Sequence, residues 1–212
     1  MAEKCKKKKN ISDFVKMLPI SVVDHMYHVG LLTSILAGKL LATEPSCPAY
    51  GKAEFAYYGK AAFLHDIGKV FVPRELLVKS TRFSFAEMSS MKNHTLFAQS
   101  MFDDMGLLGD IPEQCTKFVR DAAVYHHEWW DGSGYPYGIS HEEIPLVARI
   151  TAVCDAYDAI TSRCYKAART HRDACGELEV FSGTQFDPRL VQLFLDNEAE
   201  FSSLIRINRV RL

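Results

Sequence analysis

Residues 126–136 read HHEWWDGSGYP, and residues 65–69 read HDIGK. Both segments place histidine and carboxylate side chains beside glycines, and further histidines and aspartates occur elsewhere in the chain. Imidazole and carboxylate groups are common metal ligands, and glycine permits the backbone turns that bring such groups together. The two segments therefore predict one metal site assembled from distant parts of the chain.

The flanking sequence has the apolar spacing of helices almost throughout. From residue 20 to residue 41, apolar residues recur at three- and four-residue steps, which is typical of one long amphipathic helix. Ser84 to Glu87 has the form of a capping box, and Asp187-Pro188 combines an N-cap with a first-turn proline. Further helices are expected over residues 53–66, from Ser84 through His94, from Pro112 to Trp130, from Ser140 to Thr161 and after Asp187.

No segment has the period-two alternation of a sheet, and no linker divides the chain. We therefore expect a single all-α domain over residues 20–198. A lysine-rich terminus with a short lead-in helix precedes it (residues 1–19), and a C-terminal tail follows it (residues 199–212).

The composition narrows the function classes. The chain has 212 residues, 48% of them hydrophobic, and a formal net charge of −1, which gives no argument for binding nucleic acid or an anionic membrane. No apolar stretch is expected to reach the roughly 18 residues of a membrane span. The 6 cysteines form no CxxC pair, which excludes a zinc ribbon and fits reduced thiols. The predicted location is cytoplasmic.

Several histidines fall in or at the ends of apolar helices, together with Asp66 and with Asp155 inside the apolar run 147–160. One such histidine is more often an ordinary core residue, but a carboxylate in a helical core costs several kcal/mol unless a cation is near. At a helix end relaxed by Gly68, the His65 imidazole can bind one metal ion, while the two carboxylate oxygens of Asp66 reach to a second ion. Imidazole and carboxylate ligands suit iron, manganese, zinc or nickel better than magnesium or calcium, and the metal expected here is iron or manganese. The candidate histidines are His25, His65, His94, His126 and His127.

Two such ions close together can clamp a phosphoryl group and stabilise an in-line displacement. Lys69, one turn from His65, could neutralise a phosphate oxygen or orient the nucleophile, or it could be an ordinary exposed lysine. The sequence therefore favours phosphoester chemistry.

These motifs together resemble the HD-GYP subgroup of the HD-domain metal-dependent phosphohydrolases. The resemblance rests on HDIGK, His94, HHExxDGxGYP and the segment IPLVARITAVCDAYDAITS at residues 144–162. It implies a bundle of helices around a di-metal centre. It also implies hydrolysis of the second messenger cyclic di-GMP to pGpG or GMP.

The resemblance also assigns residues to roles. It implies metal ligation by His25, His65, Asp66, His94, His126 and Asp155, and by His127 in members with an expanded metal centre. Ser21 replaces a glutamate that supplies an extra ligand in three-metal members, which favours two ions and leaves His127 open. Asp24 and His28 are an alternative pair for this helix.

The substrate side of the site is less regular. Asp66 and Lys69 are the expected catalytic residues, and Lys69, Arg163, Lys166 and Tyr135 are the expected substrate contacts. The glycine-rich loop at residues 131–136 either closes the bundle or contacts substrate or a partner directly.

Two other functions stay open at this point. The protein could be a phosphohydrolase of another nucleotide, or a non-catalytic module that senses a dinucleotide. A cyclic dinucleotide is the expected partner, with a diguanylate cyclase or a sensor protein in trans and a homodimer as further possibilities.

Overall fold

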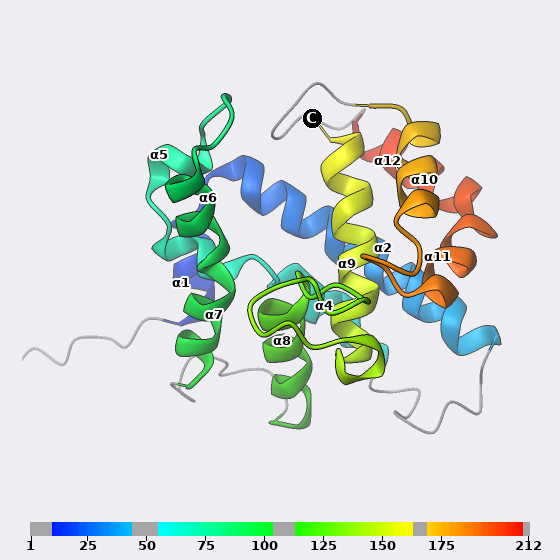
Figure 1. Ribbon diagram of the computed structural model, residues 1–212, viewed down its shortest axis with the longest axis horizontal. Helices are drawn as coiled ribbons and strands as arrows, with labels where there is room; N and C mark the ends of the chain where they lie inside the picture. The colour runs from blue at the N-terminus through cyan, green and yellow to red at the C-terminus, as the bar shows by residue number, and fades with distance from the viewer. Residues whose placement is uncertain (1–9, 44–54, 104–112, 163–168, 210–212) are drawn as a thin grey trace, which may run out of the picture.

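The computed structural model describes residues 10–43, 55–103, 113–162 and 169–209, and Figure 1 shows them as a bundle of helices. Within these residues the regular elements are all helical, apart from an isolated bridge between Ser182 and Phe186. The predicted all-α fold is confirmed. The elements in chain order are α1 (Ile11–Val15), α2 (Ile20–Thr43), α4 (Tyr58–Phe63), η1 (Ile67–Phe71), α5 (Arg74–Leu77), α6 (Phe85–Lys92), α7 (His94–Asp103), α8 (Glu113–Tyr125), η2 (His141–Glu143), α9 (Leu146–Thr161), α10 (His171–Val180), α11 (Pro188–Leu195) and α12 (Glu198–Arg209).

The long helix predicted from residue 20 is α2, which packs against α4, α9 and α11. Apolar side chains such as Met26, Val29 and Leu36 are fully buried and contribute to the core. A Cβ on Gly30 would lie 2.8 Å from the carbonyl oxygen of Gly59 in α4. The backbones of α2 and α4 can therefore approach closely, because neither glycine has a side chain.

The hydropathy of α2 corrects the expectation that no apolar stretch reaches the length of a membrane span. The helix has 24 residues, and its most apolar 18-residue window has a mean hydropathy of 1.3, so it is long and apolar enough to cross a membrane. Half of that window is buried inside the protein. Core helices pass the same test, and the contacts of α2 with three other helices account for its apolar character.

The sequence predicted one helix over residues 53–66 that ends in the HDIGK segment. This prediction is wrong. The helix α4 ends at Phe63, a turn holds His65 and Asp66, and η1 begins at Ile67. A Cβ on Gly68 would lie 1.9 Å from the carbonyl oxygen of His94. The backbone of η1 therefore packs directly on the start of α7.

Two other helix boundaries differ from the predictions. The Ser84 capping box is present, but it opens α6, which ends at Lys92, and His94 begins the separate helix α7. The expected start of the next helix, Pro112, lies outside the described residues, and α8 ends at Tyr125 rather than at Trp130. The earlier end places both histidines of the doublet in a turn after α8.

The loop that follows this turn is organised around Glu128, which is 2% exposed. Its carboxylate accepts hydrogen bonds from the backbone N–H groups of Tyr137 at 2.7 Å and Gly138 at 3.0 Å. Gly134 cannot carry a side chain, because a Cβ there would lie 2.2 Å from the backbone nitrogen of Trp129. The loop is thus folded back on the end of α8 by backbone contacts and one buried carboxylate.

The C-terminal part of the chain packs on α9. Ser140 caps the short η2 rather than α9, which begins at Leu146, whereas the predicted Asp187 cap of α11 is present. The expected tail after residue 198 instead contains α12, whose buried Phe201 stacks on Phe194 with ring centroids 4.0 Å apart. Figure 1 shows α10, α11 and α12 on the side of α9 away from α7.

Candidate metal centre

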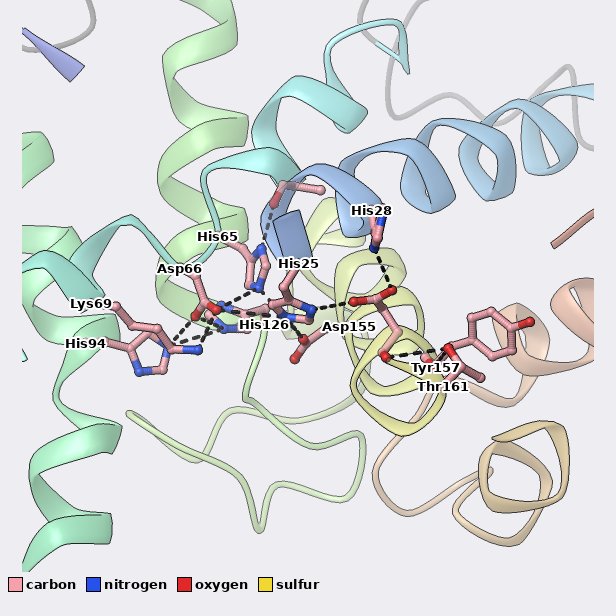
Figure 2. A network of polar contacts seen from close by, with 12 residues as sticks. His25, His28, His65, Asp66, Lys69, His94, His126, Asp155, Tyr157 and Thr161 are labelled. Atoms are coloured by element: carbon pink, nitrogen blue, oxygen red, sulfur yellow. Dashed lines mark hydrogen bonds and ion pairs between the residues drawn. The ribbon is translucent and has the colours of Figure 1, made fainter. Parts of the chain in front are cut away.

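Separate elements bring the predicted ligands to one buried place in the bundle (Figure 2). They come from α2, from the turn between α4 and η1, from the start of α7, from the turn after α8, and from α9. The side chains are those of His25, His65, Asp66, His94, His126, His127 and Asp155.

Asp66 lies between two halves of this group. Its Oδ2 is 3.3 Å from His65 Nε2 and 3.9 Å from His25 Nε2. Its Oδ1 is 3.4 Å from His94 Nε2 and 4.0 Å from His126 Nε2. One carboxylate therefore presents each of its oxygens to a different set of imidazoles.

Each half also forms a compact set of donor atoms. His25, His65 and Asp155 have ligand atoms within 4.8 Å of one another, and so do His94, His126 and His127. His25 Nε2 is 2.9 Å from Asp155 Oδ1, and His65 Nε2 is 3.7 Å from the same oxygen. A third set, formed by His65, Asp66 and His126, joins the two halves.

The imidazoles are oriented by hydrogen bonds on their outer nitrogens. The Nδ1 groups of His65, His94 and His126 bond to backbone carbonyls at 2.7, 2.8 and 2.9 Å. A ring that donates from Nδ1 to a carbonyl leaves the lone pair of Nε2 free for a metal. In each case the free nitrogen faces the other ligands.

Two atoms at the centre of the group support a metal more directly. His65 Nε2 and Asp66 Oδ1 are buried and have no hydrogen-bond partner. A buried polar atom without a partner costs about 1–3 kcal/mol, more if it is charged. The donor set present here therefore fits divalent ions better than it fits a closed hydrogen-bond network.

The protonation of the group follows from burial and from its neighbours. Burial and nearby imidazoles hold the pKa of His126 well below its usual value. Burial, followed by nearby His94, lowers the pKa of His127 to about 3, and burial lowers the pKa of His94 to about 4 although the Asp66 carboxylate opposes this. These rings are neutral at pH 7, which is the form that binds a metal.

His25 has a different environment. Burial opposes its protonation, but hydrogen bonds to Asp155 and Asp158 and the charges of both carboxylates raise its pKa well above the usual value. Its Nδ1 is 2.6 Å from Asp158 Oδ2, and His28 Nδ1 is 3.3 Å from Asp158 Oδ1. The structure therefore places His25 in the group and His28 behind it, which argues against the alternative pair Asp24 and His28.

Asp158 and His28 were not predicted as a supporting pair. The available signal was spacing: Asp158 follows Asp155 by three residues in a helix, so both carboxylates lie on the same side. Glu128 was also missed, although it directly follows the histidine doublet. Its role is visible only once the loop is folded over it.

Lys69 lies at the edge of the group and is 9% exposed. Its Nζ is 2.5 Å from Asp66 Oδ2. Burial opposes ionisation of Asp66, but Lys69 first and His65 next hold the pKa of Asp66 well below its usual value. Lys69 is therefore not an ordinary surface lysine.

Tyr135 links the glycine-rich loop to the site. Its ring stacks on His127 with centroids 4.7 Å apart, and Lys92 Nζ lies 4.7 Å from the centre of the Tyr135 ring. Burial raises the pKa of Tyr135, so its hydroxyl stays protonated. The other expected substrate contacts, Arg163 and Lys166, lie outside the described residues.

Comparisons with known proteins agree with this geometry. The HD domain family matches residues 54–190. A Vibrio cholerae protein named as a probable cyclic di-GMP phosphodiesterase is 34% identical over 179 residues, covering 84% of this chain and 41% of its own length. A Thermotoga maritima cyclic di-GMP phosphodiesterase is 37% identical over 147 residues, covering 69% of this chain and 38% of its own length.

Another relative has a related substrate in its name. A 3'3'-cGAMP-specific phosphodiesterase of Vibrio cholerae is 34% identical over 145 residues, covering 68% of this chain and 27% of that protein. The chain thus spans less than half the length of these curated relatives. Among solved structures, an HD-GYP-type protein of Bdellovibrio bacteriovorus has the same fold, with a TM-score of 0.59, 16% identity and coverage of 85% of this chain and 52% of that one.

Proposed function

The chain belongs to the HD-domain family, and on this premise we propose that it is a member of the HD-GYP subgroup and a metal-dependent phosphodiesterase that hydrolyses cyclic di-GMP. The observation that carries the proposal is the buried Asp66, whose two oxygens face two separate sets of imidazoles. Two divalent ions that share one carboxylate are close enough together to bind the phosphoryl group of a phosphoester.

The proposed ligands divide into two sets. His25, His65 and Asp155 hold one ion, and His94, His126 and His127 hold the other, with Asp66 between them. Iron or manganese is the expected metal, with zinc or nickel as alternatives. Such ions would supply Lewis-acid polarisation of the phosphoryl group and a lower pKa for the attacking water.

The residues around the ligands have proposed roles in binding the substrate. Lys69 holds Asp66 ionised and presents its positive charge at the edge of the group, where it can meet a phosphate oxygen. Tyr135 is stacked on His127, so its protonated hydroxyl can donate to the substrate from the loop side. Arg163 and Lys166, which lie outside the described residues, are the other proposed phosphate contacts.

A second substrate deserves a direct comparison. The relative named as specific for 3'3'-cGAMP supports a mixed cyclic dinucleotide as the alternative, and a non-catalytic dinucleotide sensor is the third reading. We further propose a cytoplasmic location, with a diguanylate cyclase or a sensor protein acting in trans and with a homodimer as one assembly.

Product analysis tests the proposal. Iron- or manganese-loaded protein is incubated without oxygen with cyclic di-GMP and, separately, with 3'3'-cGAMP, and the products are resolved by chromatography. The expected result is conversion of cyclic di-GMP to pGpG or GMP, faster than turnover of 3'3'-cGAMP.

Matched variants assign the activity to the site. Asp66→Asn should abolish turnover, whereas Asp196→Asn, the same change at an exposed position, should leave it intact. If the protein hydrolysed 3'3'-cGAMP faster than cyclic di-GMP, 3'3'-cGAMP would become the proposed substrate. If protein with two ions per chain bound cyclic di-GMP but did not hydrolyse it, the result would favour the alternative function as a non-catalytic dinucleotide sensor.

A further inference from the structure

A second group of metal-binding side chains lies on the other side of α9. His171 and Cys175 are in α10, and Glu198 begins α12. One donor atom from each of these residues lies within 4.8 Å of the others. None of them belongs to the HD or GYP motifs.

The helix itself places two of these donors together. His171 and Cys175 are four residues apart in α10, so they project from the same face one turn apart. Pairs of histidine or cysteine ligands about one turn apart on a helix are common in zinc sites. Glu198 then approaches this face from the first turn of α12.

The separations of the donor atoms are compatible with ligands of one ion, and the nitrogen–oxygen contact is long for a hydrogen bond. Cys175 Sγ is 3.7 Å from both ring nitrogens of His171, and Nε2 is 3.5 Å from Glu198 Oε2. An N–H···O hydrogen bond is usually about 2.7–3.2 Å long. Around a tetrahedral zinc ion, however, neighbouring N, O and S ligands are about 3.3–3.8 Å apart, given metal–ligand bonds of about 2.0–2.3 Å.

The histidine is also oriented as a ligand. The hydroxyl of Tyr157 lies 2.7 Å from His171 Nδ1, and Tyr157 is fully buried in α9. When Nδ1–H donates to this hydroxyl oxygen, Nε2 carries the free lone pair, and it lies 3.5 Å from Glu198 Oε2. The buried phenol thus holds the imidazole in place, and it can accept a hydrogen bond in the tautomer that binds a metal through Nε2.

The neutral thiol of Cys175 is a hydrogen-bond partner of the Glu198 carboxylate, which brings these two donor groups together. Burial raises the pKa of the Cys175 thiol to about 12, and the nearby Glu198 carboxylate adds to this effect. A thiol that coordinates a divalent ion loses its proton, because the ion's charge outweighs these effects.

We propose that His171, Cys175 and Glu198 form a three-ligand site for a zinc-class ion, which fastens α12 to α10. The thiolate selects zinc or cobalt over manganese and magnesium, so this site differs in chemistry from the proposed metal centre around Asp66 (the HD centre), whose ligand atoms are nitrogen and oxygen. The exposed side of Glu198 leaves the fourth position to water. The ion is structural, because none of its ligands is among the residues facing the HD centre.

Cobalt provides a specific probe for this site. Co²⁺ bound to a thiolate has an intense near-ultraviolet charge-transfer band that Co²⁺ bound only to imidazoles and carboxylates lacks. Titration of the full-length protein with Co²⁺ without oxygen should therefore produce this band at one ion per chain. The band should persist in Asp66→Asn, which impairs the HD centre, and Zn²⁺ should remove it by competition.

Cysteine variants assign the band. Cys175→Ser should abolish it, and Cys115→Ser, at another buried cysteine, should retain it. The fold of the first variant should survive, because α12 is also held by the Phe194–Phe201 stack and by an ion pair between Lys39 and Glu200 at 2.6 Å. Absence of the band in the unmodified protein, or its persistence in Cys175→Ser, would overturn the proposal.

Glu198→Gln is a milder second test. Loss of one ligand should weaken Zn²⁺ binding by at least as much as loss of a supporting hydrogen bond, roughly 10–100-fold. Metal content measured per chain should show the change only in zinc. Unchanged zinc affinity in this variant would remove Glu198 from the site and contradict the proposed link to α12.

Discussion

Asp158 Oδ2 lies 2.6 Å from His25 Nδ1, on the side of the ring opposite the Nε2 that faces Asp155. The carboxylate thus fixes the orientation of a proposed ligand without reaching the metal position itself. Carboxylates that support ligating histidines typically contribute 10–100-fold to metal affinity.

Asp158→Asn should therefore weaken metal binding at the His25 half of the centre by roughly 10–100-fold while the fold is retained. The measurement is competition with a chelator, with circular dichroism to follow the helices. Asp24→Asn, one residue before His25, should have little effect. If Asp24→Asn and His28→Ala lost metal while His25→Ala kept it, the assignment of His25 would be wrong.

Gly68→Ala should disrupt both the fold and the centre. A Cβ there would lie 1.9 Å from the carbonyl oxygen of His94, so η1 and α7 must separate, and His94 moves with α7. Thermal unfolding and metal content should both decrease. Gly38→Ala is the matched control, because its Cβ meets nothing within 4 Å, and it should stabilise α2 by about 0.5–1 kcal/mol.

Glu128→Gln should loosen the loop that follows α8 and contains the Gly-Tyr-Pro sequence at residues 134–136. The amide keeps only one oxygen for the two N–H groups of Tyr137 and Gly138, and the lost acceptor should cost about 1–3 kcal/mol. Amide hydrogen exchange should rise at these positions. Glu142→Gln, at an exposed glutamate of η2, should leave exchange in the loop unchanged; an equal increase in that control would mean that charge, rather than the buried acceptor, holds the loop.

Removal of metal should lower the thermal stability. A ligand present at 100 times its dissociation constant stabilises the folded state by about 2.7 kcal/mol, which for a protein of this size is roughly 5–10 °C per filled site. A chelator should therefore lower the unfolding temperature of the unmodified protein. The Asp66→Ala variant should lose the part of this shift that comes from the HD centre, and an unchanged shift would place the stabilising metal elsewhere.

The sequence predicted those helices whose signals are local. The apolar spacing of α2, the capping box at Ser84 and the Asp187-Pro188 start of α11 all act within a few residues. The break before His94 depends instead on the approach of Gly68, and α12 depends on stacking of Phe201 on Phe194. Such tertiary contacts have no signature in the neighbouring sequence.

The candidate site followed the same division. Residue type and spacing pointed to the histidines and to Asp66 and Asp155, and the structure brings all of them together. The supporting residues Asp158 and Glu128 were missed because a supporting role depends on what faces a side chain. The ligand assignments themselves stay predictions until metal is measured.

The pairing of His25 with Asp158 joins positions 133 residues apart in the chain. During synthesis on the ribosome, α2 emerges long before α9, so the half of the centre that contains His25 cannot close until most of the domain has been made. Metal binding there is consequently a late step in the synthesis of the chain. The free energy of binding stabilises the domain only when it is already nearly complete.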